Sequence, residues 1–137
     1  MSIVYTEITL KNAVDEAIVT AGIVKDHEVR QTTVQAVVDT GAWTLVISED
    51  IRKELGLRIT GADSGTLADG TRGSYPVAGP LEVVWKDRRT ICEAIVLPNA
   101  KDVLLGAIPL EALDLIVNPR AEEVVGAHGE QPLHYLM

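Results

Sequence analysis

A single carboxylate stands at the end of an apolar run in residues 36–42, where the chain reads Ala-Val-Val-Asp-Thr-Gly-Ala. The β-branched residues of this run favour a buried strand, and Asp39 comes where that strand must turn. Gly41 supplies the backbone freedom that a sharp turn requires. A carboxylate held in such a turn is suited to general acid–base chemistry. Asp39 is therefore the first candidate for a catalytic group.

The other residue types that support catalysis or metal binding show no comparable arrangement. Cys92 is the one cysteine of the chain and lies in a strand-like run, as expected of a small buried hydrophobe. The three histidines show no metal-ligand spacing; they are His27, His128 and His134. The acidic residues near positions 15–16 and 26–28 are compatible with a metal, but charged turn residues explain them more simply. We therefore expect no metal and no cofactor.

Composition limits the class of protein. A chain of 137 residues fits one domain over residues 1–137. The net charge of −8 argues against nucleic-acid binding, which requires a basic face. A lone cysteine excludes an intrachain disulfide, and neither a leader pattern nor an apolar run of membrane-spanning length is found. We expect a cytoplasmic protein without a membrane partner.

The elements that must position Asp39 are mostly short strands. Residues 3–10 alternate as a half-buried strand, the apolar run 17–24 is predicted as a second strand, and residues 29–38 lead into the Asp39 turn. Residues 48–56 predict the clearest helix, because Ser48 can cap its start and Gly56 can end it.

A glycine-rich hairpin is predicted in the middle of the chain, at residues 67–75, with Asp-Gly at its tip. A second hairpin joins residues 81–85 to residues 90–97. The remaining predicted elements are a strand at 103–106, a short helix at 109–113 and a strand at 115–117. The fold class is thus mostly β with one or two short helices.

The order of these features resembles that of the retropepsin-like (clan AA) aspartic proteases, in particular the bacterial and archaeal single-domain type. The resemblance rests on Asp39-Thr40-Gly41-Ala42, then the glycine-rich hairpin, then Leu104-Leu105-Gly106 and the short helix after it. It covers residues 30–120. Neither the Asp-Thr-Gly-Ala motif nor the Leu-Leu-Gly motif is specific alone. The two motifs in this order, with a glycine-rich hairpin between them, are considerably stronger evidence for the resemblance.

The resemblance implies an acid-protease barrel that closes into a C2 homodimer and hydrolyses peptide bonds. Two carboxylates must share one proton in this chemistry, and one chain holds a single Asp-Thr-Gly. Asp39 would activate a water together with its symmetry mate, while Thr40 would hydrogen-bond across the axis and Gly41 would let the two loops approach. Leu104, Leu105 and Gly106 would support the site from behind.

The resemblance also implies that the hairpin at residues 67–75 is a flap closing over an extended peptide or protein substrate. The implied substrate-binding residues are Ala42, Trp43, Ala68, Asp69, Gly70, Thr71 and Gly73. Many relatives carry a small or polar residue at the position that Trp43 occupies here. The bulky Trp43 indole either forms one wall of a substrate-binding subsite or fills the cleft. The apolar chain end, with Leu133, Tyr135 and Met137, either joins a shared dimer sheet or packs on its own domain.

Two other interpretations stay open. The same fold could serve as a non-catalytic dimerisation or peptide-binding module, or the chain could be an unrelated β-barrel with a chance Asp-Thr-Gly. Within the protease interpretation, Ala42 stands where a hydroxyl residue would stabilise the charged dyad. We therefore expect the activity to peak at mildly acidic pH.

Overall fold

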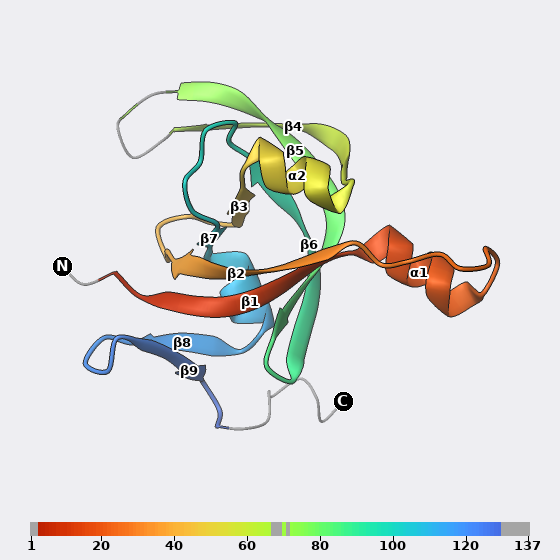
Figure 1. The fold of residues 1–137 in the computed structure, drawn as a ribbon. Coiled ribbons are helices and arrows are strands. Elements are labelled where there is room, and N and C mark those ends of the chain that lie inside the picture. The colour runs from red at the N-terminus through yellow and green to blue at the C-terminus, as the bar shows by residue number, and fades with distance from the viewer. Residues whose placement is uncertain (1–2, 67–69, 71, 130–137) are drawn as a thin grey trace.

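The computed structural model describes residues 3–66, 70 and 72–129 (Figure 1). Most of the described elements are strands. In chain order they are β1 (Tyr5–Asn12), α1 (Ala13–Ala21), β2 (Gln31–Val38), β3 (Leu45–Ile47), α2 (Glu49–Leu55), β4 (Arg58–Thr66), β5 (Arg72–Trp85), β6 (Arg88–Val96), β7 (Leu104–Leu105), α3 (Ala107–Ala112), β8 (Leu115–Asn118) and β9 (Glu123–Gly126).

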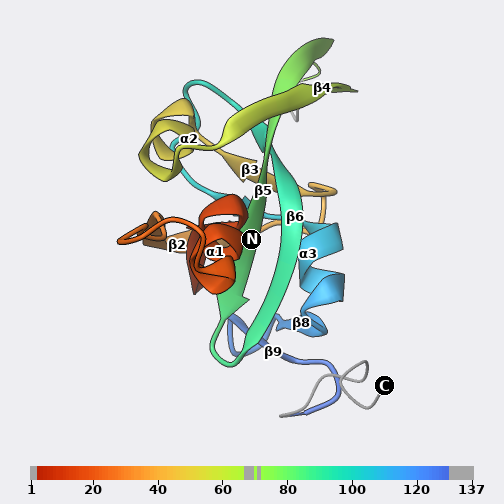
Figure 2. The same ribbon diagram turned by 90° about the vertical axis from the view of Figure 1, so that its right-hand side faces the viewer.

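Seven of these strands form one sheet in the order β1-β2-β7-β3-β6-β5-β4, and β1 also pairs with β5. The pairing of β2 with β7 and of β3 with β6 is parallel, whereas the hairpins β4–β5 and β5–β6 are antiparallel. The strands β8 and β9 form a separate pair. In both views the free end of the β4–β5 hairpin lies opposite the β8–β9 pair (Figure 2).

The core is aliphatic, as the absence of phenylalanine requires. Leu10, Leu45, Leu81 and Leu105 come from four different strands and are fully buried. Trp85 joins them at the sheet, where its indole N–H donates to the Thr6 hydroxyl at 2.9 Å. Leucine burial of this kind stabilises a fold by about 2 kcal/mol per side chain.

The strand predicted at residues 17–24 is wrong, because residues 13–21 form helix α1. Asn12 caps this helix by accepting the Asp15 backbone N–H at 3.0 Å, and Gly22 ends it at φ +67°. The apolar run is largely exposed rather than buried; Val19 is 44% exposed and Ile23 is 82% exposed. The described residues therefore contain three short helices instead of the one or two predicted.

The predicted helix at residues 48–56 is confirmed as α2. The Ser48 hydroxyl accepts the Ile51 backbone N–H at 3.2 Å, and Gly56 ends the helix at φ +63°. The predicted hairpin of residues 81–85 and 90–97 is present as β5–β6. The hairpin predicted at residues 67–75 differs in its bounds, because its first strand is β4, which ends at Thr66. The helix predicted at 109–113 begins two residues earlier, as α3. Strands β3, β4 and β9 were not predicted. No helix within the described residues is long and apolar enough to span a membrane.

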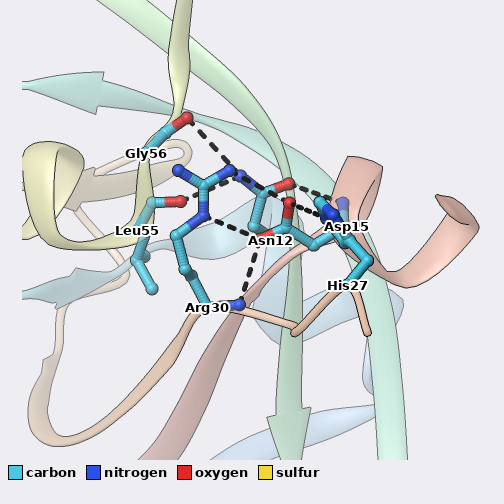
Figure 3. A network of polar contacts seen from close by, with 6 residues as sticks. All are labelled: Asn12, Asp15, His27, Arg30, Leu55 and Gly56. Atoms are coloured by element: carbon cyan, nitrogen blue, oxygen red, sulfur yellow. Dashed lines mark hydrogen bonds and ion pairs between the residues drawn. The ribbon is translucent and has the colours of Figure 1, made fainter. Parts of the chain in front are cut away.

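A buried carboxylate joins α1 to the loop before β2 (Figure 3). Asp15 is 2% exposed and accepts two side-chain N–H groups of Arg30 at 2.9 and 3.0 Å, with His27 Nε2 at 2.9 Å from its other side. Asn12 extends this network by donating to the Leu55 carbonyl at 2.8 Å. These contacts occupy both carboxylate oxygens of Asp15.

Neutralising Asp15 is expected to destabilise the protein. The hydrogen-bonded Arg30 guanidinium holds the pKa of the Asp15 carboxyl well below its usual range, despite the opposing effect of burial. We expect Asp15→Asn to lower the free energy of unfolding by about 2–3 kcal/mol. This loss is at the low end of the range for a broken buried ion pair, because the Arg30 side chain is 51% exposed and water screens its charge. Denaturant titration measures this, with Asp26→Asn as a control at an exposed position of the same loop.

The pH dependence of this effect follows from the sign of the shift. A carboxyl with a lowered folded-state pKa contributes stability above its unfolded pKa, and the contribution is lost as pH falls through the folded value. The difference between wild type and Asp15→Asn should be constant from about pH 5 to 7 and shrink below about pH 4. A difference that grew on acidification would contradict this assignment.

Candidate active site

Strand pairing fixes the position of the Asp39 loop. Val37 and Val38 of β2 run parallel to Leu104 and Leu105 of β7. The backbone N–H of Asp39 donates to the Leu105 carbonyl at 3.0 Å, so the sheet continues up to the aspartate itself. Asp39 consequently starts its turn from a fixed backbone position.

Hydrogen bonds within the turn hold the Asp39 side chain and main chain in place. The Gly41 N–H donates to Asp39 Oδ1 at 2.9 Å, and the Ala42 N–H donates to the Asp39 carbonyl at 3.1 Å. Asp39 is half-buried, whereas Thr40 and Gly41 are exposed. Backbone hydrogen bonding therefore orients the Asp39 carboxylate, and Thr40 is accessible on the surface of the loop.

Gly106 lies directly against the segment that follows Gly41. A Cβ atom at position 106 would lie 2.1 Å from the Thr44 carbonyl oxygen and 2.6 Å from that of Ala42. The next residue donates its backbone N–H to the Ala42 carbonyl at 2.8 Å, and Ile108 donates to that of Trp43 at 2.9 Å. No side chain fits this contact, so glycine is required here. The structure thus brings the two sequence motifs, residues 39–42 and 104–106, into contact.

The predicted flap hairpin corresponds to the ends of β4 and β5. Thr66 pairs with Arg72 and Gly65 with Gly73. Gly70 has φ +87°, a conformation that favours glycine. Ala68, Asp69 and Thr71 lie outside the described residues. In both views the free end of this hairpin and the loop between β2 and β3 lie on the same side of the molecule (Figure 1, Figure 2).

A pocket of about 410 Å³ lies between the loop after Asp39 and the base of this hairpin. Of the predicted substrate-binding residues, Trp43 lines it, with its side chain 59% exposed. The full lining comprises Trp43, Thr44, Thr60, Gly61, Ala62, Asp63, Val77, Cys92, Glu93, Ala94, Ile95 and Ile108. Sequence reasoning missed the β4, β5, β6 and α3 members, since only the tertiary fold brings them beside Trp43.

The two charged residues of the pocket are both acidic. The Thr60 hydroxyl donates to Glu93 Oε2, and the Thr44 hydroxyl donates to the Glu93 backbone carbonyl at 3.3 Å. Asp63 lies on β4 and is half-buried. Burial, with the nearby Glu93 charge, raises the pKa of the Cys92 thiol to about 11, so this lining group is a neutral thiol at physiological pH.

The sheet, the Asp-Thr-Gly loop and the glycine contact behind it together define a retropepsin-like aspartic protease fold. A family model described as aspartyl protease matches residues 25–108, which is more than half of the chain and includes Asp39 and Gly106. The chain therefore belongs to the aspartyl protease family.

A solved structure has a similar fold. The chain is similar to the crystal structure of a retropepsin-like aspartic protease from Rickettsia conorii, with a TM-score of 0.51 and 19% sequence identity over 85% of each chain. At this identity the similarity concerns the fold. No curated protein matches the chain significantly.

Proposed function

We propose that this protein is an aspartic endopeptidase whose active site forms between two copies of the chain. The observation that carries the proposal is the Asp39 loop, in which one exposed turn orients a carboxylate and is backed by the closely packed Gly106. The family assignment supports the same chemistry. Each chain contributes one Asp39, and the chemistry requires two.

In the proposed mechanism the two Asp39 carboxyls share a single proton, because like charges about 3 Å apart cannot both ionise. The ionised carboxylate takes a proton from a bound water, whose oxygen attacks the scissile carbonyl. The protonated carboxyl donates to the carbonyl oxygen as the tetrahedral intermediate forms. Collapse of the intermediate breaks the C–N bond, and the leaving nitrogen receives a proton from the dyad.

The remaining predicted site residues have positioning roles in this proposal. The exposed Thr40 hydroxyl would bond to the partner loop, and Gly41 would let the two loops approach without a Cβ between them. The β4–β5 hairpin would cover an extended substrate and exclude water. The substrate would pair as a strand, with alternate side chains pointing toward pockets such as that of Trp43.

The dimeric site predicts that activity depends on protein concentration. Cleavage of a mixed peptide library is measured at mildly acidic pH over a wide range of enzyme concentration. We expect the specific activity to rise and then level off as the monomers pair, because a monomer holds half of the dyad. A constant specific activity down to concentrations at which sedimentation shows only monomer would contradict the shared site. Peptide binding by a folded dimer without turnover would instead favour a peptide-binding module.

A further inference from the structure

The pocket beside Trp43 has walls and charges that match one class of substrate side chain. We propose that it receives a lysine or arginine side chain of the substrate, with Glu93 and Asp63 recognising the cation. This inference rests on the proposed function, since it assigns a specificity to the same cleft. The combination that carries it is a roomy, mainly apolar pocket whose charged lining residues are both carboxylates.

The apolar walls fit a long aliphatic stem. Trp43 and Ile108 stand at the pocket with 59% and 44% of their surfaces exposed, and Val77 and Ile95 also line it. Covering these exposed side chains with the methylene groups of lysine or arginine removes apolar surface from water. The Trp43 ring adds a face that attracts a cation.

The carboxylates of Glu93 and Asp63 determine which chemical group is favoured at the end of the aliphatic stem. Glu93 is held in place, because its Oε2 accepts the Thr60 hydroxyl and its carbonyl accepts that of Thr44. Asp63 faces the same pocket from β4. A purely apolar substrate side chain would remove water from these carboxylates without supplying a compensating charge, which is unfavourable, and an acidic side chain would be repelled. A cation at the end of the stem would be attracted by both carboxylates.

The lining of the pocket also bears on which substrate position it would receive. Asp39 is not among the lining residues, and Trp43 follows it by four positions in the chain. The pocket therefore lies beside the reacting groups rather than at them. The basic residue is expected at a substrate position displaced from the scissile bond.

Matched peptides test this assignment. Each position of a cleaved parent peptide is filled in turn with lysine or with norleucine, which retains the stem and lacks the charge. At one position displaced from the scissile bond we expect lysine to give a kcat/KM about tenfold higher than norleucine. In Glu93→Gln this lysine-to-norleucine ratio should fall to about 1–3, and Asp63→Asn should lower it partly.

Glu54→Gln is the control, because it removes one charge from an exposed residue of α2 and changes the net charge equally. It should leave the ratio as in wild type. A ratio near 1 in wild type, or one that Glu93→Gln leaves unchanged, would overturn the inference while the proposed protease function stood.

A binding measurement separates the two proposals when turnover is absent. The same peptides are titrated into wild type and into Glu93→Gln by calorimetry. Lysine-selective binding that Glu93→Gln abolishes, in a protein that cleaves nothing, would support the pocket assignment and reject the protease function. Neither binding nor cleavage of any peptide by the folded protein would overturn both.

Discussion

An Asp39→Asn variant is expected to fold like wild type. Its rate of peptide cleavage should be lower than that of wild type by a factor of at least about 1,000. Asparagine is nearly isosteric with aspartate, and its side-chain oxygen can still accept the Gly41 N–H that Asp39 Oδ1 accepts at 2.9 Å. The amide cannot take a proton from water, however, so the variant dimer holds no base. The loss should therefore appear in kcat, with the affinity for substrate largely retained.

The measurement is steady-state cleavage of one peptide by wild type, Asp39→Asn and Asp102→Asn. The last variant neutralises another exposed aspartate and should retain full activity. Thermal unfolding of all three proteins checks that the loss is chemical. Retention of wild-type turnover by Asp39→Asn would remove Asp39 from the mechanism.

Gly106→Ala is expected to cause the largest loss of stability of any small substitution at the site. The added methyl group would lie 2.1 Å from the Thr44 carbonyl oxygen and 2.8 Å from the Thr44 nitrogen. Both are backbone atoms, so relief requires the strand and the Asp39 loop to separate. We expect the free energy of unfolding to fall by about 3 kcal/mol or more.

Gly61→Ala provides the comparison, because a Cβ at Gly61 would have nothing within 4 Å and its φ lies outside the left-handed region. Its free energy of unfolding should stay within about 1 kcal/mol of wild type. Both are measured by denaturant titration. Equal unfolding midpoints for Gly106→Ala and wild type would show that the loop and the strand do not touch in solution.

The parts of the fold that could be predicted have strong local signals. The Asp39 turn follows a β-branched run, and α2 has a serine at its start and a glycine at its end. Gly106 was predicted to pass behind the Asp39 loop, because a glycine after two leucines in a retropepsin-like chain indicates a close backbone approach. The geometry at these positions is as expected.

Helix α1 and the pocket could not be predicted in the same way. The apolar residues of the 17–24 run fit a strand by composition, and the Asn12 cap that starts the helix was overlooked. The buried ion pair of Asp15 with Arg30 joins residues fifteen positions apart, so its members look like ordinary charged turn residues. The pocket is assembled from β4, β5, β6 and α3 by strand register, which short sequence patterns do not specify.

The most direct test of the shared active site is a subunit-mixing titration. A fixed amount of wild-type protein is mixed with increasing Asp39→Asn protein, at a total concentration that keeps both dimeric, and peptide cleavage is followed after exchange. If each site needs Asp39 from both chains, mixed dimers are inactive and the activity should fall toward zero as the variant reaches excess. Activity that stays at the wild-type level throughout would show that one chain acts alone and would contradict the paired-carboxylate site.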